Sequence, residues 1–265
     1  MSITLLKHFD TVFSVNNDPF NATFKLPNLL YNVKKITLKS LEMPINFNNI
    51  RATGTLNIFT INFNGYIYNA VIPPGNYTTI ASLLTALNTA IGLLLPVNNT
   101  LVFTVNSTNN IVINITSTLY PTSSINLIPT QFSNYILGFK FNSVFQGYWF
   151  CPNTVGNTIT GTITSVSTYN LSIDNYILLN IANVSSLNSN VSSVYSHFKL
   201  QLNATNGTIY YLNNGNIIND QYIETGSSNI TLSSLNVVIL DRFGNNILCN
   251  NNDYSFTLLI ECDDN

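Results

Sequence analysis

The C-terminal part of the chain alternates apolar and polar side chains in the pattern of a β-strand. One set of positions is apolar (Tyr254, Phe256, Leu258 and Ile260), and the positions between them are Ser255, Thr257, Leu259 and Glu261. A period of two places the two sets on opposite faces of a strand. An apolar run, residues 235–240, precedes this strand, with an Asp241-x-x-Gly244 turn in between. Two such runs around a glycine-containing turn predict a hairpin, so we expect this end of the chain to be held in a sheet.

Two strand-like runs also occur near the N-terminus. Residues 22–27 alternate briefly, and Pro27 is expected to close this strand. Residues 33–43 form a longer run, and Pro44 is expected to end its pairing. The apolar positions of the longer run are Ile36, Leu38, Leu41 and Met43. Because these positions change phase in the middle of the run, the sequence predicts a β-bulge near residues 39–40.

Hairpin and strand patterns continue through the rest of the chain. Asn64-Gly65 separates two alternating runs and is the strongest short hairpin signal available. Apolar residues in 101–105 mirror those in 111–115 across a polar turn, which predicts a second hairpin. Further strands are predicted over residues 176–181, 198–202, 208–212 and 230–240.

One stretch has helical periodicity. Its apolar positions are Ile80, Leu83, Leu84, Leu87 and Ile91, a spacing that places them on one face of an α-helix. Thr78 or Thr79 is positioned to cap the helix. Gly92 and Pro96 interrupt the apolar continuation, so the segment is too short to span a membrane. We therefore expect a single amphipathic helix packed on a sheet.

The predicted elements define an all-β protein. We expect one domain over residues 1–265, a single jelly-roll sandwich of two antiparallel sheets with one short helix. Residues 117–133 and 152–170 are rich in Ser, Thr, Asn and Pro and are expected to be long loops, with an insertion around 140–195. No linker is evident that would divide the chain into two domains.

Charged residues are scarce, at 8% of the chain against about 25% in ordinary globular proteins. Asn makes up roughly one residue in six, far above its average use. Part of this bias is expected from AT-rich codons, but Lys shares those codons and is also scarce. The simplest interpretation is a surface largely covered by other subunits, where each unpaired charge would carry a desolvation cost.

The few charges are unevenly distributed. Residues 1–51 carry six basic and three acidic side chains, whereas residues 220–265 carry one basic and seven acidic side chains. These are either ordinary solvated charges or complementary edges of neighbouring subunits. The net charge of −2 gives no support to nucleic-acid binding, which leaves a basic face on a protein.

Catalytic residues are hard to find. His8 and His197 are the only histidines, and neither has a carboxylate at a spacing that suggests a partner, so both are interpreted as structural. The Asp241-x-x-Gly244 segment lacks the further oxygen ligands of a calcium loop and is interpreted as a turn. No phosphate-binding glycine motif and no nucleophile elbow occur. We expect no catalytic, metal or cofactor site.

Two other features could suggest a functional site. Residues 148–150 read Tyr-Trp-Phe, which suits either a carbohydrate-stacking platform or ordinary packing on the two faces of a strand. Asp263 and Asp264 lie at the end of the chain, where tails fray.

Four segments together resemble the penton, or vertex capsid, proteins of virophages, polinton-like viruses and large icosahedral DNA viruses. They are residues 36–50, 72–78, 136–139 and 235–261. The family-like structural positions within them are Leu41, Pro44, Gly75, Asn76, Tyr77, Gly138, Phe139, Asp241, Gly244 and Phe256. Residues 140–195 match nothing in the family pattern.

The resemblance implies a structural virion protein with a jelly-roll fold and no catalytic residues. Five copies would fill each vertex of the capsid and meet the major capsid protein, a double jelly roll, around the rim, after assembly in the host cytoplasm. The alternative is a fibre-head or lectin-like jelly roll that binds a receptor or glycan through residues 140–195. An enzyme is the third and most distant reading.

The chain has three cysteines, Cys151, Cys249 and Cys262, at no metal-ligand spacing. No secretory signal is recognised at the N-terminus, so we expect a reducing environment and no disulfide. Thiol titration of the denatured protein, without reductant, is expected to find all three thiols reactive. A single reactive thiol would contradict this expectation.

Overall fold

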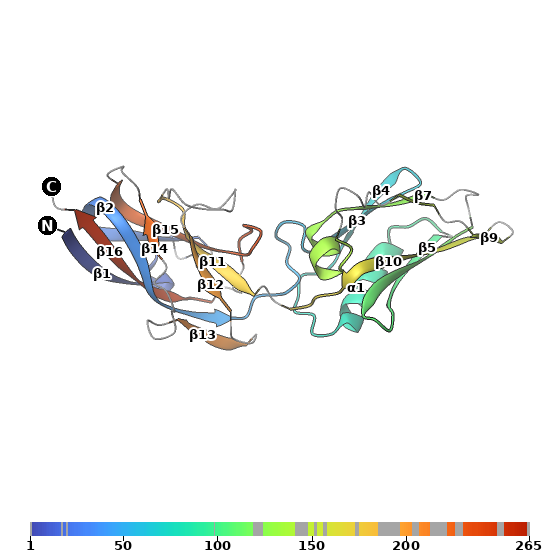
Figure 1. The fold of residues 1–265 in the computed structure, drawn as a ribbon, viewed down its shortest axis with the longest axis horizontal. Helices are drawn as coiled ribbons and strands as arrows, with labels where there is room; N and C mark the ends of the chain where they lie inside the picture. Colours follow the sequence, from blue (N-terminus) through green and yellow to red (C-terminus); the bar gives the residue numbers. More distant parts are fainter. Residues whose placement is uncertain are drawn as a thin grey trace. The chain divides into compact units, whose positions relative to one another are not determined.

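The structure is a computed structural model in which the strands dominate (Figure 1). It describes residues 2–16, 18–19, 21–97, 99–118, 124–140, 148–150, 153–155, 158–172, 175–184, 197–202, 207–212, 222–225, 230–247 and 252–263. The all-β class, the sandwich packing of antiparallel sheets and the amphipathic helix predicted from the sequence are confirmed.

The described residues group into two compact units, Met1–Phe47 with Asp174–Asn265 (unit 1) and Asn48–Ile173 (unit 2). The strands of unit 1 form an eight-stranded sheet, and those of unit 2 form two four-stranded sheets. That residues 1–265 fold as one jelly-roll domain stays a prediction.

Unit 1 is built around one long central strand, β2 (Ala22–Ile45). The sheet order is β1 (Ser2–Asp10), β16 (Ser255–Asp263), β2, β15 (Ile230–Leu240), β11 (Tyr176–Ile181) and β12 (His197–Gln201). β13 (Thr208–Leu212) and β14 (Tyr222–Glu224) also pair with β2. One edge of β2 therefore pairs with β16, and the other pairs in turn with β13, β14 and β15.

β2 has to bend, since its 24 residues would extend for about 80 Å if straight. The bend lies where its pairing with β15 is irregular: Leu232 is opposite Leu30, but Ser234 is opposite Lys25. Pro27 lies in this irregular part, and Asn32 has a positive φ of 51°. The prediction that Pro27 ends the strand is thus wrong, because the proline falls in a bulge, where no ladder hydrogen bond is required.

The prediction that Pro44 ends the pairing is also wrong. Pro44 lies opposite Ile209 of β13, and the strand continues to Ile45. The register of β16 on the other edge stops at Glu42, so Pro44 has a neighbouring strand on one edge only. A residue without an N–H group is tolerated in such a position.

The predicted bulge is confirmed. Thr257 lies opposite Ser40 and Leu258 opposite Leu38, which leaves Lys39 as the extra residue of β2. The insertion changes the phase of the strand, so Leu38 and Leu41 are both buried.

The predicted C-terminal hairpin is wrong. β15 and β16 lie on opposite edges of β2 rather than beside each other. The Asp241–Gly244 turn does form, with the Gly244 N–H donating to the Asp241 carbonyl at 3.1 Å. Periodicity locates strands but does not choose their partners, and here both apolar strands pair with the longer β2.

Unit 2 contains two sheets with a shared core. One sheet consists of β5 (Asn99–Val105), β6 (Asn110–Ser117), β10 (Thr158–Thr168) and β9 (Asn153–Val155). The other consists of β4 (Tyr66–Val71), β3 (Ile58–Phe63), β7 (Ser124–Ile128) and β8 (Tyr148–Phe150). Both predicted hairpins are confirmed, because Phe63 lies opposite Tyr66 and Val105 opposite Ile111.

Two segments predicted to be loops contain strands. β7 lies within residues 117–133, and the 11-residue β10 lies within residues 152–170 and pairs with β6 along most of its length. β10 reads Thr-Ile-Thr-Gly-Thr-Ile-Thr-Ser-Val-Ser-Thr, so its β-branched residues favour a strand, although its Ser and Thr content also suits a loop. The loop prediction is wrong for these residues because composition outweighed alternation.

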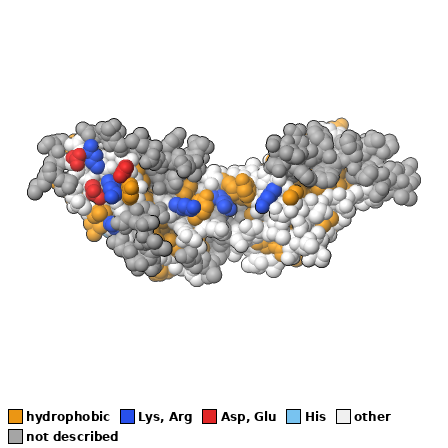
Figure 2. Space-filling model, in the orientation of Figure 1, with side chains coloured by type: hydrophobic (Ala, Val, Ile, Leu, Met, Phe, Trp, Pro, Cys, Tyr) orange, Lys and Arg blue, Asp and Glu red, His pale blue; other side chains and the backbone are white. Residues whose placement is uncertain are grey.

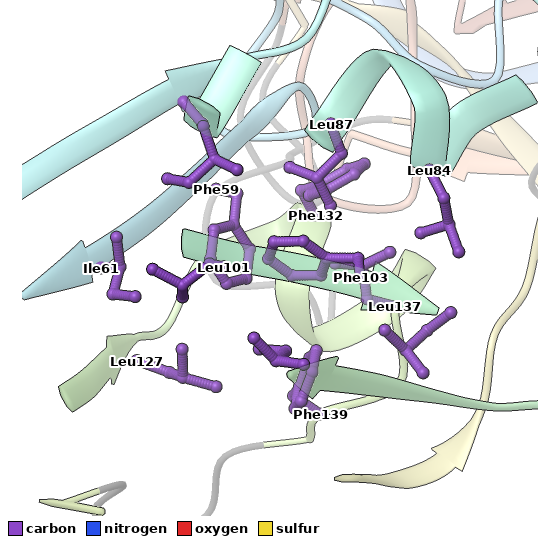
Figure 3. Packing of buried hydrophobic residues seen from close by; sticks show 14 of the residues in the cluster. Phe59, Ile61, Leu84, Leu87, Leu101, Phe103, Leu127, Phe132, Leu137 and Phe139 are labelled. Atoms are coloured by element: carbon purple, nitrogen blue, oxygen red, sulfur yellow. The ribbon is translucent and has the colours of Figure 1, made fainter. Parts of the chain in front are cut away.

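The core of unit 2 lies between its sheets and the helix α1 (Ile80–Gly92) (Figure 3). Phe59 of β3 and Phe103 of β5 meet edge to face at 5.0 Å. Leu83, Leu84, Leu87 and Ile91 of α1 are buried, as its periodicity predicted. The Thr79 hydroxyl caps the helix by accepting from the Ser82 N–H.

A substitution at Gly138 tests how closely this core is packed. This glycine follows the short π-helical turn η2 (Phe132–Ile136), has φ of +80°, and a Cβ there would lie 2.3 Å from the Ser167 carbonyl oxygen of β10. G138A is expected to reduce the free energy of unfolding by about 3 kcal/mol or more, because a left-handed L residue costs about 1–2 kcal/mol and a backbone clash is added.

The matched control is G65A, since Gly65 has φ of +87° but nothing within 4 Å of the added Cβ. It isolates the cost of the backbone conformation. Equal shifts of the urea midpoint in the two variants would contradict the close approach at Gly138.

Candidate functional site

The family-like positions do not converge on one cleft but fall into separate structural clusters. Among the described residues, no group of three or more His, Cys, Asp or Glu side chains is arranged to hold a metal ion. No helix in the described part of the chain is long and apolar enough to cross a membrane. The candidate functional features are therefore the buried junctions and the exposed surfaces that the clusters create.

A buried asparagine forms the first junction. Asn49 is in the first of the four family-like segments, and its amide nitrogen donates to the carbonyls of Tyr77 and Leu171, each at 2.9 Å. Its amide oxygen accepts from the Tyr77 N–H at 2.9 Å. The adjacent Ile50 exchanges two backbone hydrogen bonds with Gly75. One side chain thus ties three distant parts of unit 2 together.

Three of the family-like positions lie in or beside this junction. Gly75 pairs with Ile50, Tyr77 bonds Asn49, and Asn76 between them is exposed. The Tyr77 hydroxyl donates to the Pro73 carbonyl at 3.0 Å, and partial burial raises the pKa of Tyr77. The sequence did not single out Asn49, because in a chain so rich in Asn nothing distinguishes a buried amide from an exposed one.

Two other family-like positions lie in the unit 2 core. Gly138 accepts a hydrogen bond from the Ser167 N–H at 2.9 Å, which joins η2 to β10. Phe139, which follows it, is buried and donates its N–H to the Ser133 carbonyl. Figure 3 shows Phe139 and Leu137 among the buried side chains of this core.

The Asp241 turn of unit 1 is held by its own carboxylate. Asp241 is buried and accepts from the backbone N–H groups of Phe243 and Asn245 at 2.8 and 2.9 Å. The amide nitrogen of Asn245 adds a bond at 3.1 Å. Gly244, the last residue of the turn, has φ of 81°, in the left-handed region that favours glycine. The carboxylate is used in structure, in agreement with its interpretation as a turn residue.

Leu41, Pro44 and Phe256 lie in or beside the unit 1 core. Leu41 is directly opposite Phe256 across β2 and β16. The Phe256 ring stacks on Phe9 of β1 at 5.1 Å and meets Phe24 of β2 edge to face at 5.5 Å. This aromatic cluster joins the three neighbouring strands through side chains as well as backbone.

The uneven charges of the two chain ends meet within one subunit. The Lys34 Nζ lies 3.3 Å from the Asp263 Oδ2, and the Lys35 Nζ lies 3.9 Å from the Glu261 Oε1. Figure 2 shows acidic and basic side chains next to one another at the end of this unit where the termini lie in Figure 1. These four charges pair across β2 and β16 of the same chain. The pairing matches neither interpretation of the uneven charges, because they are neither isolated in solvent nor paired between subunits.

His8 lies on the edge strand β1 and is exposed. Its Nδ1 is 3.2 Å from the Thr257 hydroxyl oxygen of the neighbouring strand β16. The partner of His8 in this contact is thus a hydroxyl group and not a carboxylate. The His197 and residue 148–150 side chains lie outside the described residues, as do Cys151, Cys249 and Asp264. Cys262 is a buried free thiol, and burial followed by the charge of Asp263 raises its pKa.

Large apolar side chains are exposed on both units. The most exposed are Phe13 (81%), Val97 (82%) and Leu93 (83%). Val12 and Val15 are also exposed, so three apolar side chains gather within four residues around Phe13. The exposure of this group could not be predicted from the sequence, because a short Val-Phe-Ser-Val run has no periodicity that distinguishes an exposed turn from a buried strand.

Comparisons with known proteins give a distant likeness to a solved structure. No protein-family profile matches the chain, and no curated protein matches it. Among solved structures, the chain is similar to the selenomethionine-labelled mavirus penton protein, with a TM-score of 0.37 and 13% sequence identity. That comparison covers 99% of this chain and 100% of the other.

The Asn49 junction can be tested by a nearly isosteric change. N49D keeps the acceptor for Tyr77 but loses both donors and buries a charge, so it is expected to reduce the free energy of unfolding by about 3 kcal/mol or more. The control is N48D, which adds the same charge at a half-buried neighbour that donates to neither carbonyl. The urea midpoint at neutral pH distinguishes them, and equal losses would refute the special role of Asn49.

Proposed function

We propose that this chain is a structural virion protein, a penton-like capsid protein that forms homopentamers at the five-fold vertices of an icosahedral DNA virus. It has no catalytic role. Its partners are four further copies of itself and the major capsid protein, a double jelly roll, around the vertex. Its place is the virion, after assembly in the cytoplasm of the host.

The observation that carries this proposal is the contact between the four family-like segments. Residues 36–42 of the first segment pair with residues 255–260 of the last through β2 and β16. Residues 36–50 also join residues 72–78 through Asn49 and Ile50. The segment 136–139 joins them in the core of unit 2, because Ile136 and Phe139 lie in the same buried cluster as Ile50 and Ile72. The family-like segments therefore contact one another within each unit, with residues 36–47 in unit 1 and residues 48–50 in unit 2.

The surface supports the same proposal. Charges make up only 8% of the chain, and four of them pair within the subunit. Three exposed apolar side chains, Val12, Phe13 and Val15, gather within four residues of unit 1. Exposed apolar groups that gather locally mark interaction sites. A subunit covered by neighbours accounts for this combination more simply than a free monomer does.

The number of subunits tests the proposal. Sedimentation equilibrium of the purified protein is expected to give a particle near 147 kDa, five times the chain mass of 29.4 kDa. A trimer would favour a fibre head, and a monomer that binds glycans would favour a lectin-like module. Either result would reject the penton proposal.

The particle is expected to withstand salt. Its contacts depend on apolar burial and on Asn, Ser and Thr hydrogen bonds, and apolar burial is not weakened by NaCl. Exposed ion pairs contribute about 0–1 kcal/mol, and the Debye length falls to about 3 Å at 1 M. Sedimentation at low salt and at about 1 M NaCl should give the same mass. Dissociation at high salt would make charge pairing the main source of affinity.

A further inference from the structure

A rigid apolar knob projects from unit 1 directly after β1. It consists of Val12, Phe13 and Val15, in and beside the 3₁₀ turn η1 (Thr11–Phe13). Phe13 leaves 81% of its surface exposed. An aromatic side chain exposed to this degree costs solvation free energy in an isolated subunit and is typical of an interface anchor.

The backbone of the knob is fixed by hydrogen bonds to the C-terminal strand region. The Val12 N–H donates to the Asp10 carboxylate at 3.0 Å, and the Thr11 N–H donates to the Tyr254 carbonyl at 3.0 Å. The Thr11 hydroxyl accepts from the Tyr254 N–H and donates to the Asp253 carboxylate, both at 2.9 Å. A turn held at this many points loses little freedom when it binds, so it is preorganised.

A groove of about 420 Å³ opens on the same unit between β1 and the bend of β2. Its apolar lining includes Ile3, Leu5, Leu26, Leu29, Leu30 and Tyr31. Alternation places Ile3 and Leu5 on the same face of β1 as Phe9, which is buried in the aromatic cluster. The groove is therefore an open end of the unit 1 core, where the inward face of β1 continues without a covering side chain.

The charges beside the knob and the groove are complementary. Asp10 and Asp253 lie at the base of the knob and bond the turn. Lys7 and Asp263 line the groove, but Asp263 pairs with Lys34. Among the described lining residues, Lys7 is the charged side chain other than the paired Asp263, whereas the knob has two carboxylates at its base. Complementary charges of this kind orient two apolar surfaces.

The knob cannot fill the groove of its own subunit. Leu5 lies five strand residues, about 17 Å, before the turn that begins after Asp10, and the Phe13 side chain is 81% exposed rather than folded back onto β1. The two surfaces are therefore different patches of one subunit. Head-to-tail contacts between different patches generate closed rings when the rotation between copies closes.

We propose that the knob of one subunit inserts into the groove of a second copy of this chain, with Phe13 packed among Leu5, Leu29 and Tyr31. The contact repeats around the ring, each subunit giving a knob on one side and a groove on the other. This inference rests on the proposed function only for the number of subunits, because the same contact can form in a ring of any size.

Two single variants test each half of the contact. F13D removes the knob and L29D charges the groove, and each is expected to weaken self-association at least about 30-fold, the effect of an interface hot spot. Phe13 and Leu29 are 81% and 50% exposed, so both variants should keep the thermal melting profile of the parent protein. The control is L93D, at an 83% exposed leucine of unit 2, which should assemble like the parent.

Mixing the two variants gives the decisive result. F13D retains a groove and L29D retains a knob, so an equimolar mixture is expected to form dimers of twice the 29.4 kDa chain mass, although neither variant associates alone. Continued monomers in the mixture, or assembly of F13D by itself, would overturn the contact, as would an equal loss in L93D. If the parent protein is a ring of another size and the mixture still dimerises, the contact stands and the pentamer fails.

Discussion

The bent central strand β2 is the constraint on which unit 1 depends. It pairs with β16 on one edge over Val33–Glu42, and with β15, β14 and β13 in turn along the other edge. Its two irregularities have different effects. The Lys39 bulge changes which side chains face the core, whereas the bend around Pro27 and Asn32 opens the core beside β1. A straight strand with regular pairing would leave neither the aromatic cluster nor the groove.

Asparagine has a second structural role that its abundance conceals. An amide side chain offers N–H donors and a carbonyl acceptor side by side, the same kinds of group that a strand residue presents to its neighbour. Asn88 uses both groups on the backbone of Phe103 and so attaches α1 to β5. Asn183 does the same between Ser234 and Asn236. Together with Asn49, these residues complete sheet edges and junctions without adding charge, so the unusual composition also stabilises the interior.

The sequence predicted local structure better than it predicted pairing. Alternation identified β5, β6 and the Asn64-Gly65 hairpin, and the spacing of Leu83, Leu87 and Ile91 identified α1, because these signals are local. The partners of β15 and β16 depend on contacts with β2, far away in the sequence, and no local pattern encodes them. β10 was missed because its Ser and Thr residues belong equally to loops and to strands. Asn49 and Phe13 became visible only when burial and exposure were known.

The pairing of β1 with β16 has a consequence for how the chain is made. Ser2 lies opposite Asp263, so β1 lacks this partner until residues 255–263 have left the ribosome. Unit 2 is continuous in sequence and has no such requirement. The η1 turn also waits, because Asp253 and Tyr254 hold it. The knob therefore lacks the hydrogen bonds that order it until these late residues have been made, whereas unit 2 can fold from a continuous stretch of chain.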